Sequence, residues 1–343
     1  MLHVVPYLPP AVSGVGDYAM VLARALRAGY GIECVFAVGN GVEGEDLEGF
    51  RVVSLRRGED LGRVALGFDR VLLQYVGYGY ERRGCPVWLI RALRGWQAAR
   101  PDGRLVTMFH ELYAFGPPWR SSFWVHLVQR WVCGQLARMS FGCMTNRAES
   151  RARLNRLGGR EDVVAVPVFS NVGEPEAVPG IGRRPAQMVV YGGMAASAVG
   201  RLRRQIEELG VRRVVRFGAR GGGWPELGVP FYDRGRISAV ALSDLLLESR
   251  VGWLDYFDGY LAKSGIFAAY CAHGVVPVLF RENDSEADGL VAAKHFLAGV
   301  NWGVSWSQEE LEVVANNARA WYGTHTVARC AAAVTERLGG VFL

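Results

Sequence analysis

The stretch LHVVPYLPPAVSGVGDYAMVLARALRAG (residues 2–29) decides the fold. Residues 2–8 form an apolar run typical of a buried strand, and residues 16–29 carry apolar side chains at helical spacing. Gly14 and Gly16 occupy the short turn between the two segments. A strand that leads through such a turn into a helix favours a parallel sheet covered by helices.

Strand-like and helix-like segments go on alternating along the whole chain. The alternation stops once, at residues 170–186, where proline and glycine are frequent, as they are in linkers. We therefore predict an α/β protein of two domains, each a parallel sheet covered by helices. Their predicted bounds are 1–169 for the N-terminal domain, 170–186 for the linker, 187–320 for the C-terminal domain, and 321–343 for a C-terminal helical tail.

Composition agrees with a folded protein of two domains. The chain has 343 residues, of which 50% are hydrophobic and 21% charged, enough apolar surface for two cores. Its formal net charge of +6 comes almost entirely from arginine, because Lys263 and Lys294 are its only lysines. This charge favours an anionic partner. The arginines are scattered and accompany no nucleic-acid-reading motif, so we expect no nucleic-acid partner.

The six cysteines lie far apart, with no C-x-x-C pair, so the sequence predicts neither a zinc site nor a disulfide framework. We expect them to be reduced in a cytoplasmic protein. The N-terminus lacks the charged and apolar regions of a signal peptide, and no uncharged apolar run is long enough to span a membrane.

Residues 14–19, GVGDYA, match the glycine fingerprint of dinucleotide-binding turns. An NAD site also needs glycines directly after the first strand and an acidic residue at the end of the second. Here Pro9 and Pro10 separate the first strand from the glycines. The second predicted strand, residues 32–38, is followed by Gly39 and has no acidic residue at its end. These departures count against NAD. A helix that starts near Asp17 still offers backbone N–H groups to another anion, and the alternative is a tight turn without a ligand.

Residues 9–26, PPAVSGVGDYAMVLARAL, resemble the opening of the family 4 glycosyltransferases. Similar motifs occur at 72–80, 107–116, 189–193 and 268–280. The resemblance implies the GT-B fold, in which two Rossmann-like domains face each other across a cleft and the C-terminal domain holds most of a nucleotide-sugar. It also implies that Gly14, Val15 and Gly16 face the donor diphosphate, and that transfer retains the anomeric configuration without a metal. The nucleotide-sugar is then a substrate, and no cofactor is expected.

Residues 263–265 are the best candidates to hold the departing diphosphate. Lys263 adds an ammonium group at a predicted helix start, and Ser264 adds a hydroxyl group. Gly265 lets a phosphate approach the backbone closely. The alternative is a solvated lysine beside an ordinary helix cap. At the positions where the family carries two donor-binding glutamates, this chain has Leu261 and Ala269. Because neither side chain can accept a hydrogen bond, the sequence leaves open which sugar is bound and whether the protein is active.

His110 follows a predicted strand, at the end that faces the ligand in such folds. The resemblance implies that it bonds hydroxyls of donor or acceptor; the alternative is a structural histidine. Glu111 beside it could cap a helix or accept a hydrogen bond. Asp17 either caps its helix or orients an acceptor hydroxyl. Arg201, Arg203 and Arg204 fit a solvated helix face better than a phosphate site.

Residues 119–139 are predicted to form a helix with Phe123, Trp124, Leu127, Val128 and Trp131 on one face. Such a stripe is usual for a core. The alternative is an aromatic and basic surface that meets a membrane-bound, lipid-linked acceptor at the inner face of the membrane.

The sequence thus predicts a metal-independent glycosyltransferase that moves a hexose-type sugar from a UDP- or GDP-sugar to a glycan or lipid-linked acceptor. A sugar-nucleotide epimerase of the same fold lacks support, because no set of carboxylates is evident. The rival from another class is a non-catalytic protein that binds a sugar-nucleotide or a partner.

Overall fold

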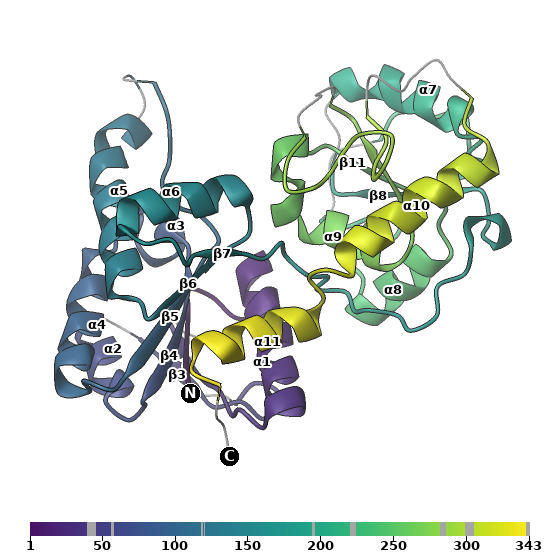
Figure 1. Ribbon diagram of the computed structural model, residues 1–343. Coiled ribbons are helices and arrows are strands. Elements are labelled where there is room, and N and C mark those ends of the chain that lie inside the picture. Colours follow the sequence, from purple (N-terminus) through teal and green to yellow (C-terminus); the bar gives the residue numbers. More distant parts are fainter. Residues whose placement is uncertain are drawn as a thin grey trace. The chain divides into compact units, whose positions relative to one another are not determined.

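A computed structural model describes the chain except for residues 40–45, 56–57, 118, 120, 194–195, 220–223, 282–285, 299–304 and 341–343 (Figure 1). The chain divides into two compact units. Unit 1 comprises Met1–Pro167 and Val327–Leu343, and unit 2 comprises Val168–Thr326. The last segment of the chain therefore belongs to the first unit.

Unit 1 contains a seven-stranded parallel sheet in the order β3-β2-β1-β4-β5-β6-β7. Its strands are β1 (Leu2–Val5), β2 (Val35–Val38), β3 (Val52–Ser54), β4 (Arg70–Tyr75), β5 (Arg104–Phe109), β6 (Gly142–Thr145) and β7 (Val164–Ala165). Its helices are α1 (Gly14–Tyr30), α2 (Gly58–Ala65), α3 (Gly77–Tyr80), α4 (Val87–Ala99), α5 (Ser121–Met139), α6 (Ala148–Gly158) and α11 (Val327–Arg337).

Unit 2 contains a five-stranded parallel sheet in the order β10-β9-β8-β11-β12. Its strands are β8 (Gln187–Tyr191), β9 (Arg213–Phe217), β10 (Phe231–Asp233), β11 (Val251–Leu254) and β12 (Val276–Leu279). Its α-helices are α7 (Val199–Glu208), α8 (Ala239–Leu247), α9 (Gly265–Ala272) and α10 (Gln308–Tyr322). Short 3₁₀ helices occur at η1 (Ile181–Arg183), η2 (Ala196–Ala198) and η3 (Asp258–Lys263).

The central strands are buried on both faces, which explains their continuous apolar sequences. All four residues of β1 and of β11 are buried. A parallel sheet with helices on both faces buries its strands in this way. The apolar runs of the sequence therefore became strands of the two sheets, and the runs with helical spacing became the helices over them.

Helix α11 packs along α1 in unit 1 (Figure 1). The Tyr18 hydroxyl of α1 lies 2.9 Å from the Cys330 sulfur of α11, and both side chains are buried. Within the described residues, no helix is both long enough and apolar enough to cross a membrane.

In each unit, the first five strands in chain order follow the spatial order 3-2-1-4-5. This is the Rossmann order, whose direction reverses beside the first strand. The reversal lies between β1 and β4 in unit 1, and between β8 and β11 in unit 2. Ligands of such sheets bind at the carboxyl ends of the strands next to this point.

Candidate functional site

The predicted site residues follow the carboxyl ends of sheet strands in both units. In unit 1, Gly14, Val15, Gly16 and Asp17 follow β1, and His110 follows β5 directly. In unit 2, residues 263–265 follow β11 through η3. Each unit thus carries one group of candidates.

Helix α1 begins earlier than the sequence suggested. Its first residue is Gly14, and the cap is Ser13, whose hydroxyl oxygen accepts a hydrogen bond from the Gly16 N–H at 3.3 Å. The interpretation of Asp17 as the cap is therefore wrong, because a serine four residues earlier already fills that position. Both glycines belong to the first helical turn, where backbone N–H groups point toward the helix start.

The two glycines of this turn have different surroundings. A Cβ built on Gly16 would lie 2.7 Å from the carbonyl oxygen of Tyr7, so the close approach of α1 to the segment after β1 requires glycine there. A Cβ built on Gly14 would meet no heavy atom of the described residues within 4 Å. Gly16 therefore serves packing, whereas packing does not require glycine at position 14.

We expect Gly16→Ala to lower the free energy of unfolding by about 1–3 kcal/mol, because the backbone of residues 7–8 must move away. Gly14→Ala should leave stability unchanged or raise it by up to about 1 kcal/mol, since alanine favours helices. Urea unfolding of the two variants measures this difference. Equal losses of stability would contradict the packing described for Gly16.

His110 is the first member of a buried chain of three polar side chains. Its Nε2 lies 2.7 Å from Gln74 Oε1, and Gln74 Nε2 lies 2.8 Å from His3 Nε2. In this arrangement the glutamine amide donates to His3 and accepts from His110, which fixes the His110 tautomer. His3 and Gln74 are fully buried, and burial, with His110 adding to it, lowers the pKa of His3 to about 3. His3 therefore stays neutral at neutral pH.

The His110 ring also touches the start of α1. Its centroid lies 4.9 Å from that of Tyr18, edge to face. Asp17, next to Tyr18, is exposed, and partial burial of its carboxyl group raises its pKa. The structure thus brings together the start of α1 and the end of β5. Both sequence-predicted groups of unit 1 therefore border the same place.

In unit 2, Ser264 caps helix α9. Its hydroxyl oxygen accepts a hydrogen bond from the Phe267 N–H at 3.2 Å, and the residue is buried. Lys263 precedes it, partly exposed, with its Nζ 6.0 Å from the centre of the Tyr260 ring. A Cβ on Gly265 would make only an ordinary contact with Asn171, at 3.8 Å, so packing does not require glycine there.

Leu261 and Ala269, which the resemblance to family 4 aligns with two glutamates, are both buried in unit 2. The nearby acids are engaged elsewhere: Asp255 pairs with Arg281 at 2.8 Å, and the Asp258 carboxylate accepts from the Gly259 N–H at 2.6 Å. Within the described part of the chain, no group of three or more His, Cys, Asp or Glu side chains could hold a metal ion.

Two of the arginines of α7 donate hydrogen bonds to backbone carbonyls of neighbouring loops. Arg201 donates to the Phe280 carbonyl at 2.8 Å, and Arg203 donates to the Glu226 carbonyl at 2.9 Å. The expected solvated face therefore also ties α7 to neighbouring loops. Glu111, beside His110, is exposed.

Sequence reasoning did not single out His3 or Gln74. Both lie inside apolar strands, β1 and β4, which pair in register at the point where the sheet order reverses. A polar residue in a run that is otherwise apolar was the signal available, because a buried amide needs a partner.

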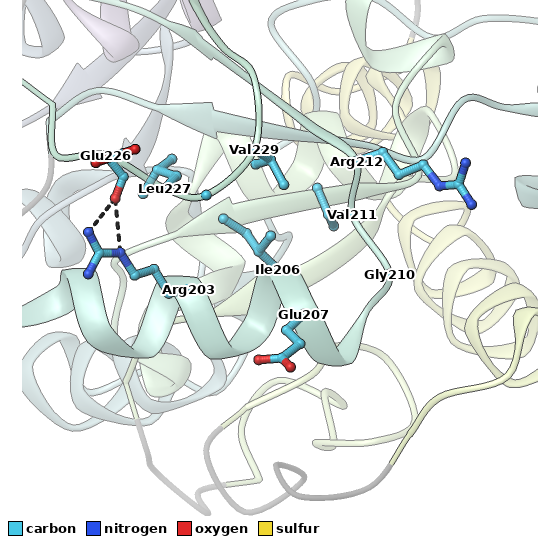
Figure 2. A pocket seen from close by; sticks show the side chains of 10 residues that line it. Arg203, Ile206, Glu207, Gly210, Val211, Arg212, Glu226, Leu227 and Val229 are labelled. Carbon is cyan, nitrogen blue, oxygen red and sulfur yellow. Dashed lines mark hydrogen bonds between the residues drawn. The ribbon is translucent and has the colours of Figure 1, made fainter.

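A hollow of about 660 Å³ opens elsewhere in unit 2 (Figure 2). It lies beside α7 and the segments that lead into β9 and β10, and Arg203 and Glu226 meet on one side of it. This is the amino edge of the sheet, opposite the edge where the candidate residues lie. None of the residues predicted to bind the donor lines it.

No protein-family model and no curated protein matches the sequence. Solved structures do match it. One is an alpha-glucosyltransferase in complex with UDP, 9% identical over 98% of each chain, with a TM-score of 0.60. Another is an alpha,alpha-trehalose-phosphate synthase (UDP-forming) from Burkholderia xenovorans, 12% identical over 99% of this chain and 100% of that one, with a TM-score of 0.59.

A third match is a UDP-GlcNAc 2-epimerase from Neisseria meningitidis bound to UDP-GlcNAc, 9% identical over 98% of each chain, with a TM-score of 0.55. At these identities the likeness concerns the fold, because one fold serves different reactions. The strand orders of the two sheets and the structural matches along nearly the whole chain indicate the same fold. The protein has the GT-B fold, with two Rossmann-like units.

Proposed function

We propose that the protein is a glycosyltransferase that moves a hexose-type sugar from a UDP- or GDP-sugar, with a UDP-sugar preferred, to a glycan or lipid-linked acceptor. One observation carries the proposal: in a GT-B fold, the residues that we expect to bind phosphate and sugar hydroxyls lie at the carboxyl end of the sheet in both units. The solved structures of this fold named above include complexes with UDP and UDP-GlcNAc.

Unit 2 offers the groups that a leaving diphosphate needs. The first turn of α9 presents backbone N–H groups, and the Ser264 hydroxyl hydrogen is not used in its contact with Phe267. Lys263 adds a positive charge beside them. Such groups stabilise the charge that develops on the leaving oxygen. In this proposal neither a metal nor a cofactor takes part, and the nucleotide-sugar is a substrate.

Unit 1 offers groups that can bond hydroxyls of the sugar and of the acceptor. His110 is oriented by Gln74 and bonds a hydroxyl of the sugar or the acceptor, while Asp17 orients the acceptor hydroxyl. In a retaining reaction the acceptor attacks on the side from which the diphosphate leaves, and a phosphate oxygen helps to take its proton. No protein nucleophile is then required.

Lys263→Ala is expected to weaken binding of UDP and UDP-glucose by about 10- to 100-fold, because a charged contact to phosphate contributes about 1.5–3 kcal/mol. Lys294→Ala is the matched control, since it removes the only other lysine, which is exposed in unit 2. Isothermal titration calorimetry measures both. Equal affinities of the two variants would remove Lys263 from the donor site.

A non-catalytic sugar-nucleotide-binding protein is the second candidate, favoured by the apolar residues Leu261 and Ala269 where the family carries glutamates. The two candidates differ in turnover. Release of UDP from UDP-glucose, or of GDP from GDP-mannose, above the rate without protein supports the transferase. Binding without release, across glycan and lipid-linked acceptors, supports the second candidate.

A further inference from the structure

The start of α5 and the loop before it expose an unusual number of large apolar side chains. Trp119 is 84% exposed, Trp124 73% and Leu127 72%. The complete set along this segment is Phe115, Trp119, Phe123, Trp124, Leu127, Val128 and Trp131. We refer to it as the α5 face. The interpretation of this stripe as core packing is wrong, because every member is at least 42% exposed.

Helix α5 already has a separate side that packs in the core of unit 1. Val132, Cys133, Leu136 and Ala137 are fully buried there. Surface helices of globular proteins normally present polar residues opposite such a side. The first half of α5 instead presents aromatic and aliphatic side chains, and a contiguous exposed apolar patch marks a site of interaction.

Arginines are frequent on the helix that carries the α5 face and on the two helices packed beside it. Residues 81–160 contain fourteen arginines, no lysine and four acidic residues, so this segment is more positive than the whole chain. Helix α5 packs against α4 on one side and α6 on the other (Figure 1). The exposed arginines on these three helices are Arg91 and Arg94 on α4, Arg130 and Arg138 on α5, and Arg151 and Arg156 on α6.

We propose that the α5 face binds the surface of an anionic lipid bilayer. Tryptophan and phenylalanine favour the boundary between headgroups and acyl chains, and Leu127 and Val128 lie between two tryptophans, where they can enter the apolar layer. The arginines of these helices then meet lipid phosphates, with their apolar stems along the same boundary. The proposal goes beyond the proposed sugar transfer and does not depend on it.

A second copy of the chain fits this face less well. A symmetric dimer would place two arginine-rich surfaces opposite each other, and like charges repel. A single-stranded nucleic acid would match the charge and could stack on tryptophans. It would leave the aliphatic Leu127 and Val128 without an apolar partner, which a bilayer supplies.

The test is co-sedimentation of the full chain with vesicles, without any sugar-nucleotide. We expect binding to vesicles of phosphatidylcholine mixed with phosphatidylglycerol, at least about tenfold weaker binding to phosphatidylcholine alone, and weakening with salt. The double variant Trp124→Ser/Leu127→Ser should bind the mixed vesicles at least about tenfold more weakly, because both side chains lose their apolar surroundings.

Val240→Ser/Val313→Ser is the matched control, since both valines are exposed on helices of unit 2, at 73% and 58%. It should bind like the unchanged protein, and circular dichroism should show that all variants are folded. An equal loss of vesicle binding in both double variants would overturn the proposal, and so would equal binding of the unchanged protein to the two kinds of vesicle. So would a dimer that only Trp124→Ser/Leu127→Ser dissociates, or capture of a single-stranded oligonucleotide in place of the vesicles.

Discussion

Replacing Arg184 by methionine is expected to lower the free energy of unfolding of unit 2 by about 3–5 kcal/mol, because several buried carbonyls lose their donor together and each acceptor left unsatisfied costs about 1–3 kcal/mol. Arg184 is 3% exposed. Its guanidinium donates to the carbonyls of Pro179 at 2.7 Å, Ser249 at 2.8 Å and His273 at 2.8 Å, and to that of Leu246 at 3.3 Å. Methionine fills much of the volume but donates to none of them.

These carbonyls belong to three separate segments. Leu246 and Ser249 lie at the end of α8, and His273 is the cap residue at the end of α9. Pro179 lies in the stretch 170–186. Cations stabilise helix C-termini, and this guanidinium serves two of them. Burial lowers the pKa of Arg184 to about 10, so the group remains charged at neutral pH.

Arg183→Met is the matched control, because Arg183 is the exposed neighbour in the same stretch. It should change the free energy of unfolding by less than about 0.5 kcal/mol, as surface substitutions usually do. Urea denaturation followed by circular dichroism measures both variants. A loss below about 1 kcal/mol for Arg184→Met would show that water replaces the guanidinium at these carbonyls.

Arg184 shows where reasoning from the sequence stops. Proline and glycine in residues 170–186 predict an irregular connection, and the structure has only η1 as regular structure there. Composition alone does not tell Arg183 from Arg184, yet one is exposed and the other buried. The difference arises from the ends of α8 and α9, which lie about 60 to 90 residues further along the chain.

The fold itself could be predicted, because long apolar runs and helical spacing are local signals. The strands now labelled β1, β4, β5 and β11 coincide with apolar runs of the sequence. Strand β10 was missed, since Phe231–Asp233 is a three-residue edge strand, too short to show a strand pattern in the sequence. Asp17 was misread as a cap because the helical spacing does not reveal that Ser13 fills this position first.

His110→Ala is expected to reduce kcat for transfer or release of sugar by about a hundredfold or more, as removal of a positioned hydrogen-bonding or proton-transferring group does. The affinity for UDP should change less than about threefold, since in the proposal UDP is held by unit 2. His126→Ala is the control in unit 1. His126 bonds the Ala114 carbonyl at 2.8 Å and follows no strand of the sheet.

A structural role for His110 would give a different result, and Gln74→Glu separates the two roles. The carboxylate would lie between His110 and His3, and a negative charge raises the pKa of a neighbouring imidazole. If His110 acts on the reacting groups, the acid limb of the kcat profile should move to higher pH in Gln74→Glu. If it only supports the sheet, His110→Ala should lose stability with kcat retained, and the Gln74→Glu profile should stay in place. That pair of results would remove His110 from the reaction and leave unit 1 without its proposed hydrogen-bonding group.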